Sequence, residues 1–181
     1  GVPSNKIKSY LSDKMIRNLG KLCGKMHSIE IKGKLKNLPI SEISYKAYYD
    51  NIIKKIYLDY IKRHVKDKLF LEMINLTYKE IGKKIPIKNY NPKLVLSQGD
   101  YCEQNIIVNK GEYRLIDFED LGLTDPASQL AHIFIDFGKP FSENKIELFL
   151  EEYLKVCKIN KKDQLMKRVN DWIPLKRFAI F

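Results

Sequence analysis

The spacing of apolar residues divides the chain into a helical first part, a short β-rich middle and a helical last part. Three amphipathic helices are predicted in the first part, over about residues 12–28, 41–63 and 66–83. Ser12 is a candidate N-cap of the first helix, Ser41 opens the second, and the third ends near Gly82. The apolar positions available for burial on these helices are Met15, Ile16, Leu19, Leu22, Cys23, Met26, Ile43, Ala47, Ile52, Ile56, Tyr60, Leu69, Met73, Leu76 and Tyr78.

The pattern changes after Pro86 and Pro92. Three β-rich runs follow, KLVLS, NIIVN and YRLIDF, at residues 93–97, 105–109 and 113–118. The turn between the last two contains Gly111, where a positive φ is expected, so it predicts a hairpin. The helical period then returns behind Asp125 and Pro126, a cap and a first helical residue. This helix would bury Leu130, Ile133, Phe134 and Phe137, and two more helices are predicted over about residues 143–157 and 162–181.

These elements predict an α+β fold that is mostly α, with a small central β-hairpin or sheet and a surrounding helical subdomain. The chain of 181 residues is long enough for one substantial core, and it contains no internal repeat or clear linker. Residues 1–90 and 125–181 would be the helical parts of one unit, and residues 93–120 its hairpin and loops. The last predicted helix stops without an evident cap, which indicates a truncation.

The composition is that of a folded protein, with 44% hydrophobic and 30% charged residues. No apolar run approaches the roughly 18 residues that span a bilayer, and the first residues lack the apolar core of a signal peptide. Cys23, Cys102 and Cys157 form no CxxC or Cys/His cluster, so neither a disulfide framework nor a zinc site is expected. We therefore expect a cytoplasmic location and no membrane partner.

The net charge of +11 raises the question of a nucleic-acid partner. Nearly all of the positive charge is lysine, spread along every segment, as on solvated faces. Proteins that bind nucleic acids typically gather arginine forks and aromatic platforms on one face. Nucleic acid is therefore not the expected partner.

Three polar residues around the short β-rich runs form the candidate site. Asp100 follows Gly99, which allows a tight turn, and Asn105 comes five residues later. Asp117 is expected to close the second strand of the hairpin and to reach the same point. Two carboxylates and an amide oxygen are hard ligands, the set expected for Mg²⁺ held partly by substrate phosphates. The catalytic-loop Asp, the metal-binding Asn and the second metal-binding Asp of protein kinases have the same order.

At these residues the sequence resembles the aminoglycoside phosphotransferase and choline kinase-like family. The resemblance rests on SQGDYCEQN, LIDFED and DPASQLA in this order, with NLGKLCGKMHSI upstream. The corresponding family patterns are His-Gly-Asp-x4-Asn, Ile-Asp-x-Glu/Asp and Asp-Pro-x-x-Asp-Leu-Ala. The resemblance spans about residues 18–131, and it implies the C-terminal lobe of a protein-kinase-like fold.

The resemblance also implies an activity and its residues. The activity would be transfer of the terminal phosphate of ATP or GTP to a hydroxyl of an aminoglycoside, choline or ethanolamine, homoserine or a sugar-like acceptor. Asp100 would be the catalytic base or orienter, and Asn105 and Asp117 would bind Mg²⁺ that bridges the phosphates. Glu119 and Asp120 would line the acceptor side or support the loop, and Asp125 would have a capping role.

The sequence departs from the family pattern in three ways. Gln98 stands where the family has His before Gly-Asp, and a Gln amide can supply a hydrogen bond of a different shape. Gln129 replaces the second Asp of the Asp-Pro motif. The chain also contains no Gly-rich loop and no strand Lys ahead of the catalytic loop. We therefore expect a C-terminal lobe without its N-terminal nucleotide-binding lobe, which would be its natural partner, and an isolated chain that is inactive.

Several alternatives stay open at this stage. A non-catalytic kinase-like binding or scaffold protein is the competing hypothesis, supported by Gln98 and the missing lobe. Trp172 with Phe178 and Phe181 is expected in the core, although an aromatic wall for a cationic acceptor is an alternative. Acidic residues could either receive a cationic acceptor or belong to ordinary solvated faces; these are Glu103, Glu119, Asp120, Glu143, Glu147, Glu151, Glu152 and Asp171. Four other residues are expected to take no part in the chemistry. Cys102 would be a bystander thiol, His27 and His132 would be packing residues, and His64 would be a solvated side chain.

Overall fold

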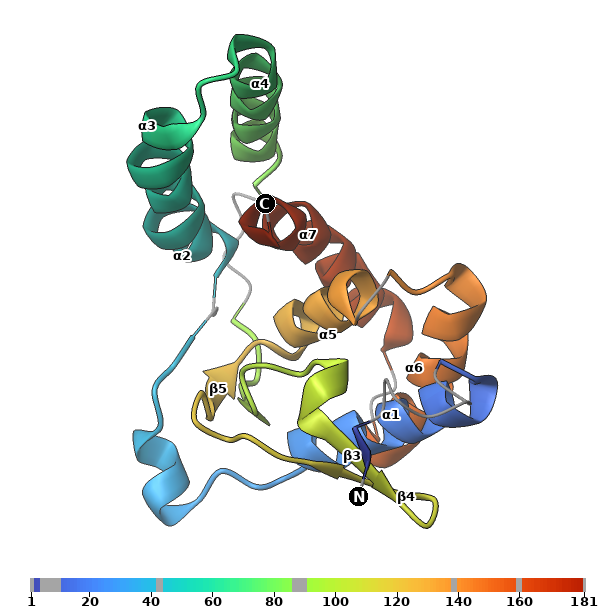
Figure 1. Cartoon of the computed structure of the whole chain (residues 1–181). Helices are drawn as coiled ribbons and strands as arrows, with labels where there is room; N and C mark the ends of the chain where they lie inside the picture. The colour runs from blue at the N-terminus through green and yellow to red at the C-terminus, as the bar shows by residue number, and fades with distance from the viewer. Residues whose placement is uncertain are drawn as a thin grey trace.

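The chain folds into a helical body with a helical arm at one end and small sheets at the other (Figure 1). This computed structural model describes residues 2–3, 11–41, 44–85, 91–137, 140–158 and 161–180. The mostly helical α+β architecture predicted from the sequence is confirmed. None of the helices in these residues is long and apolar enough to cross a membrane.

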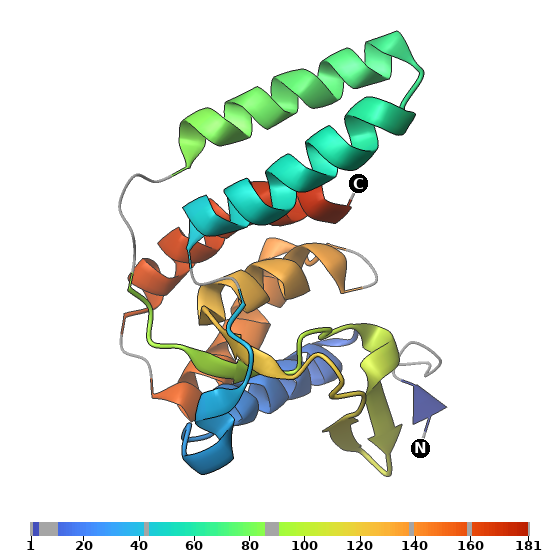
Figure 2. The same ribbon diagram turned by 90° about the vertical axis from the view of Figure 1, so that its left-hand side faces the viewer.

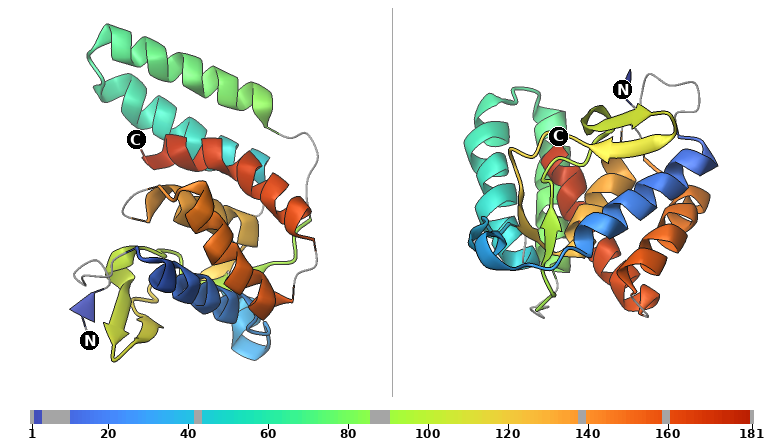
Figure 3. Two further views of the ribbon diagram at one scale, coloured as in Figure 1. Left: turned by 90° about the vertical axis from the view of Figure 1, so that its right-hand side faces the viewer. Right: turned by 90° about the horizontal axis from the view of Figure 1, so that it is seen from below.

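Helix α1 (Asp13–His27) begins where the sequence predicts. The hydroxyl of Ser12 accepts a hydrogen bond from the backbone N–H of Met15 at 3.3 Å and caps the helix. The predicted apolar stripe of α1 is buried except for Leu22, which is half-buried. Helix α6 (Glu143–Cys157) lies alongside α1 (Figure 3). At Gly20 an added Cβ would collide with the backbone of Phe149 on α6, so the missing side chain lets the two helices approach closely.

The arm consists of two helices that run side by side away from the body (Figure 2). Its second helix, α4 (Lys68–Lys84), is capped by Asp67, whose carboxylate accepts a hydrogen bond from the N–H of Phe70 at 2.8 Å. The ring of Tyr78 on α4 stacks on that of Tyr57 with 4.2 Å between the centroids. The first helix of the arm consists of α2 (Tyr45–Tyr48), the π-helical turns η3 (Tyr49–Ile53) and η4 (Ile56–Ile61), and α3 (Lys62–His64).

The arm begins later and buries less than the sequence predicts. Ser44 caps its first helix in place of Ser41, because the Ser44 hydroxyl accepts from the N–H of Ala47 at 3.0 Å. The expected positions Ile43 and Pro86 lie outside the described residues. The arm is covered only where its two helices face each other and where they face α7 (Lys162–Ile180). Five residues predicted for burial are therefore 41–70% exposed: Ile52, Tyr60, Leu69, Met73 and Leu76.

Two small antiparallel sheets carry the middle of the chain. The predicted hairpin is present, and Lys110 and Gly111 both have positive φ at its turn. Its second strand is shorter than predicted and stops before Asp117. Two strands have no counterpart among the predicted elements, β1 (Val2–Pro3) and β5 (Gly122–Thr124). The sheets have the orders β1–β3–β4 and β2–β5, formed by β1 (Val2–Pro3), β3 (Ile106–Asn109), β4 (Glu112–Leu115), β2 (Val95–Ser97) and β5 (Gly122–Thr124).

The segment between α1 and the arm runs along one side of the body (Figure 1). It contains the short helix η2 (Gly33–Asn37), and Ile40 forms a parallel bridge with Leu123 of β5. The connection therefore attaches to the smaller sheet before it reaches the arm.

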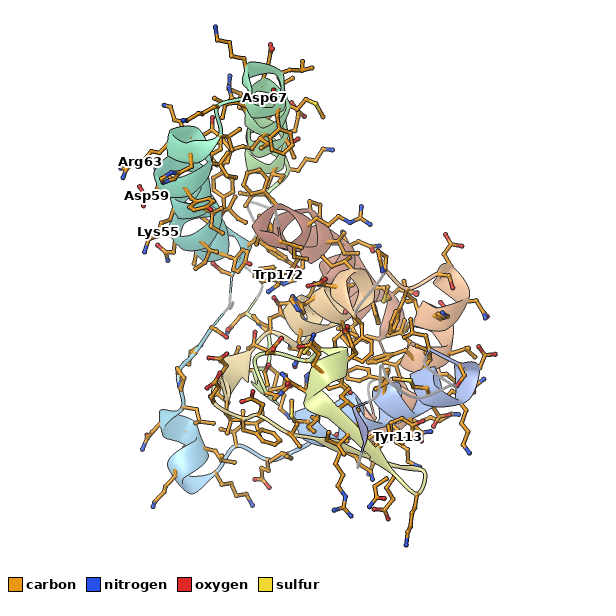
Figure 4. The ribbon with its side chains drawn as sticks, in the orientation of Figure 1. Lys55, Asp59, Arg63, Asp67, Tyr113 and Trp172 are labelled. Carbon is orange, nitrogen blue, oxygen red and sulfur yellow. The ribbon has the colours of Figure 1, made fainter. Side chains whose placement is uncertain are left out.

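Helices α5 (Pro126–Asp136) and α7 (Lys162–Ile180) pack together at the centre of the molecule. Trp172 of α7 has no exposed surface and lies where α7 meets α2 and α5 (Figure 4). The four apolar residues predicted for α5 are buried, with Phe137 just beyond the helix end. Phe181, expected at the end of the last helix, lies outside the described residues.

Candidate active site

The loop that follows β2 carries Asp100. Gly99 has φ +92°, and an added Cβ would lie 2.5 Å from the carbonyl oxygen of Asp120. The Ser97 hydroxyl accepts a hydrogen bond from the N–H of Gly99 at 3.1 Å, which fixes the start of the turn. Glycine is therefore required at position 99 for two reasons. The backbone is left-handed there, and the segment after the hairpin lies too close to leave room for a side chain.

Asn105 reaches back to Asp100 across this loop. Its amide Nδ2 donates to the Oδ2 of Asp100 at 2.9 Å and to the backbone oxygen of Asp100 at 3.0 Å. The short helix η5 (Glu103–Asn105) brings the amide into place, and the N–H of Cys102 closes the loop on the carbonyl of Asp100 at 3.0 Å. The carboxylate of Asp100 stays exposed beside an ordered amide.

Asp117 reaches the same region by a different route from the one predicted. Strand β4 ends at Leu115, so Asp117 does not lie within the strand. The N–H of Ile116 donates to the carbonyl of Asn105 at 3.0 Å, and Asp117 follows with a left-handed backbone, φ +59°. This conformation is uncommon for a residue with a side chain. It turns the chain out of the sheet next to Asn105, with the Asp117 side chain exposed.

Gln98 supports the segment around Asp117 through hydrogen bonds to its backbone. Its side chain is fully buried, and its Nε2 donates to the carbonyl of Ile116 at 2.6 Å and to that of Asp117 at 2.7 Å. Two backbone oxygens next to the candidate metal ligand are thus held by one amide group. The other atom of this amide, Oε1, has no hydrogen-bond partner among the residues that the structure describes.

The acidic residues beside this centre have different surroundings. Glu119 and Asp120 are exposed in the turn after Asp117, and Asp120 packs against Gly99. Asp125 is buried and caps α5 by accepting from the N–H of Ala127 at 2.8 Å. It also pairs with Arg168 and accepts from Nε1 of Trp172 at 3.2 Å. The geometry of Asp125 is that of a capping and packing residue.

The buried ring of His27 takes part in a neutral network. Its Nε2 lies 2.6 Å from Oε1 of Gln129, and its Nδ1 lies 2.9 Å from the hydroxyl of Tyr153. Because an amide oxygen can only accept, Nε2 carries the proton and Nδ1 accepts from the tyrosine. Burial lowers the pKa of His27 to about 4. This matches the packing role expected for His27, and it gives Gln129 a partner.

The remaining candidates have structural roles or lie at the surface. Burial raises the pKa of the Cys102 thiol, which disfavours the nucleophilic thiolate form. Trp172 has no exposed surface and donates to Asp125 within the core, so it offers no open face to a cationic acceptor. On α6 three of the acidic residues pair with basic side chains, Glu147 with Lys162, and Glu151 and Glu152 with Arg17 and Lys155. These α6 acids belong to a surface of alternating charge.

The donor set at the candidate centre suits a hard divalent cation. Since Asn105 uses its Nδ2 toward Asp100, its Oδ1 remains available as a ligand. Asp117 offers a carboxylate for which the described residues provide no hydrogen bond or ion pair. Within those residues no three His, Cys, Asp or Glu side chains gather into a metal site. One amide and one carboxylate, completed by phosphate oxygens, are the type of partial site that Mg²⁺ occupies.

Comparisons with known proteins give the family and the fold of the chain. A loop Asp, an Asn five residues later and an Asp after a hairpin define the C-terminal lobe of a protein-kinase-like phosphotransferase. Residues 4–167 match the family described as the phosphotransferase enzyme family, so the chain belongs to that family. No curated protein matches the chain.

Solved structures with the same fold include two phosphotransferases and an ethanolamine kinase. A spectinomycin phosphotransferase, solved with ADP and spectinomycin, is 20% identical with a TM-score of 0.61 over 99% of this chain and 56% of its own. An aminoglycoside-3′-phosphotransferase of type VIII is 17% identical, with a TM-score of 0.63 over 98% and 65%. An ethanolamine kinase from Plasmodium vivax is 17% identical, with a TM-score of 0.57 over 93% and 52%. The chain thus spans between half and two thirds of their length.

Proposed function

We propose that this chain is the C-terminal catalytic lobe of a Mg²⁺-dependent small-molecule kinase. The reaction would transfer the terminal phosphate of ATP or GTP to a hydroxyl of a small acceptor, of the aminoglycoside, choline or ethanolamine, homoserine or sugar-like kind. An N-terminal lobe of the same enzyme would complete the nucleotide site, and the isolated chain would be inactive. The cytoplasm, where ATP and GTP are available, is the proposed compartment.

One observation carries the proposal, namely the hydrogen bond between Asn105 and the Asp100 carboxylate beside the turn at Asp117. In the proposed step Asp100 orients the acceptor hydroxyl and takes its proton as the oxygen attacks the terminal phosphorus. The bond from that phosphorus to the bridging oxygen breaks, and its electron pair leaves with the nucleoside diphosphate. Asn105 and Asp117 would hold Mg²⁺, which neutralises charge on the phosphates when bound.

The scaffold hypothesis loses part of its support in this geometry. Gln98 was one of its two arguments, since it replaces a family histidine. The two hydrogen bonds from Gln98 to the carbonyls of Ile116 and Asp117 support a bracing role of the replacement for the segment that carries the candidate metal ligand. Nothing in the described residues specifically favours a scaffold.

The test compares Asp100→Asn with a matched control in the full-length protein that contains this chain. Asp59→Asn is the control, because Asp59 lies on the outer side of the arm, 53% exposed beside Arg63 (Figure 4). The assay is nucleoside diphosphate release over a panel of acceptors, with nucleotide affinity measured in parallel. We expect Asp100→Asn to lose about 10²–10⁴-fold in turnover, with nucleotide affinity retained. Turnover near wild type would remove Asp100 from the mechanism.

A further inference from the structure

The outer side of the arm carries a row of exposed apolar side chains on α4. Leu69, Met73 and Leu76 are 70%, 58% and 57% exposed, and Phe70 beside them is 47% exposed. The first three lie at positions i, i+4 and i+7 and Phe70 at i+1, so the four share one face of the helix. We call these four residues the α4 stripe. A contiguous apolar patch rimmed by polar residues is typical of an interaction site.

The opposite face of α4 already has packing partners. The ring of Tyr78 stacks on Tyr57 across the arm and also contacts Phe178 of α7. Ile81 is 7% exposed. At 100° per residue, Tyr78 and Ile81 point away from the stripe. The stripe is therefore not the part of α4 that holds the arm together.

The stripe lies far from the candidate active site. Figures 2 and 3 show α4 at the edge of the molecule, on the far side of α7 from strands β3 and β4. The first helix of the arm reaches toward the catalytic loop, where Ile52 and Ile56 line a cavity of about 360 Å³ that Gly99 and Tyr101 also line. An N-terminal lobe that completes the nucleotide site beside the catalytic loop would not reach the stripe.

The stripe is complementary to a second copy of itself. Met73 is at its centre, with Leu69 four residues before it and Leu76 three residues after it. Lys66 and Glu80, of opposite charge, lie seven residues before and seven residues after Met73. Two α4 helices that pair antiparallel about a twofold axis at Met73 place Leu69 of each copy against Leu76 of the other. The same axis brings Lys66 of each copy next to Glu80 of the other.

The charges around the stripe are compatible with this pairing. Lys66 is exposed, and Glu80 pairs with Lys83 at 2.7 Å where both side chains are more than half exposed. An exposed pair of this kind contributes little to stability, so Glu80 can exchange Lys83 for a lysine of the second copy. Acidic and basic residues, Glu72 and Lys79 among them, both border the stripe. A helix face that binds anionic membranes is typically bordered by basic residues instead.

We infer that the protein forms a twofold-symmetric dimer through the α4 stripe, with the two α4 helices antiparallel. The inference does not depend on the proposed function, because none of Asp100, Asn105 and Asp117 takes part in the contact. One helix face is smaller than a standard protein–protein interface, so the dimer should be weak, with a Kd of about 10–100 µM.

Sedimentation equilibrium of the full-length protein, from micromolar to millimolar concentration, measures this Kd. Met73→Lys would place two ammonium groups next to each other at the twofold axis. It should raise the Kd at least about 100-fold, since like charges that face each other across an interface are strongly unfavourable. Ile29→Lys, at an exposed apolar position in the body, is the matched control and should leave the Kd unchanged. Circular dichroism would show that each variant keeps the fold.

An exchange of charges tests the antiparallel arrangement. Lys66→Glu and Glu80→Lys should each weaken self-association about 10-fold, because like charges then meet at both ends of the contact. An equimolar mixture of the two variants should associate as tightly as the wild type, since each mixed pair regains opposite charges at both ends. Lys79→Glu, at an exposed position outside the stripe, is the control for altered charge alone and should have little effect.

Four results would overturn the inference. They are a monomer at every concentration, a dimer that persists in Met73→Lys, a mixture that associates no more tightly than its two components, and binding of the wild-type monomer to anionic phospholipid vesicles that Met73→Lys abolishes. The last result would assign the stripe to a membrane surface. Phosphate transfer by the full-length protein decides the proposed function separately, because an active monomer would refute only the dimer and an inactive dimer only the kinase.

Discussion

Replacing Gly99 with alanine tests how closely the catalytic loop approaches the segment after Asp117. Gly99 has φ +92° and lies against Asp120, so an alanine meets two obstacles at once. Gly111, at the hairpin turn, has φ +82° but no atom within 4 Å of an added Cβ. Both glycines therefore have a positive φ, but the space around them differs.

The expected magnitudes follow from this difference. A left-handed backbone costs an L-residue about 1–2 kcal/mol, and this applies to both substitutions. An extra carbon forced into a packed site costs about 1–3 kcal/mol more, and this applies to Gly99→Ala alone. We expect Gly111→Ala to lower the free energy of unfolding by about 1–2 kcal/mol and Gly99→Ala by about 2–5 kcal/mol.

Urea denaturation of the two variants, followed by circular dichroism, measures both free energies against wild type. In the full-length enzyme Gly99→Ala should also reduce phosphate transfer, because the displaced loop carries Asp100, while Gly111→Ala should leave transfer unchanged. If Gly99→Ala were no more destabilising than Gly111→Ala, the contact with Asp120 would not constrain the loop, and our reasoning about this turn would be wrong.

Three further predictions concern buried polar groups. Gln98→Ala should lower the free energy of unfolding, measured by urea denaturation, by about 1–3 kcal/mol, because two backbone oxygens lose their donor. Gln104→Ala, at an exposed position, should leave it almost unchanged. Equal effects of the two substitutions would argue against the bracing role of Gln98. Asp125→Asn should cost about 3–5 kcal/mol, because it removes the buried carboxylate that pairs with the half-buried Arg168. The exposed Asp50→Asn should cost less than about 1 kcal/mol. For His27 the folded pKa of about 4 lies below the ordinary value of 6.5, so the stability contributed by its neutral ring is complete above pH 6.5. About 3 kcal/mol of this stability should be lost as the pH falls from 6.5 to 4. A pH series of denaturation curves would compare the wild type with His27→Asn, and the variant should not show the loss.

The sequence determined the local elements whose signals depend on neighbouring residues. Ser12 with the stripe on α1, Asp125 with Pro126, and the Lys110–Gly111 turn each combine a backbone preference with a periodic pattern, and all three were predicted correctly. The motifs SQGDYCEQN, LIDFED and DPASQLA, in this order, also indicated the family. Such features are short-range, so the sequence alone contains the physical cause.

The tertiary structure decided which apolar residues are covered and how the site is held. Leu69 and Met73 have the spacing of a buried stripe, yet they are exposed because the arm extends away from the body. Strand β5 was missed because its three residues pair with β2 across a long sequence separation. The left-handed conformation at Asp117 and the support from Gln98 likewise depend on contacts between distant segments.

For Lys176, the sequence pattern and the tertiary structure determine different properties. It continues the buried stripe of Val169 and Trp172 at helical spacing, so the sequence contained a signal for a buried lysine. The pattern does not indicate what surrounds this lysine, because the cavity that it lines is formed by the arm, β2 and α7 together. The sequence alone indicated the candidate residues for phosphate transfer, but which side chains line the cavity beside them follows only from the packing of these distant elements.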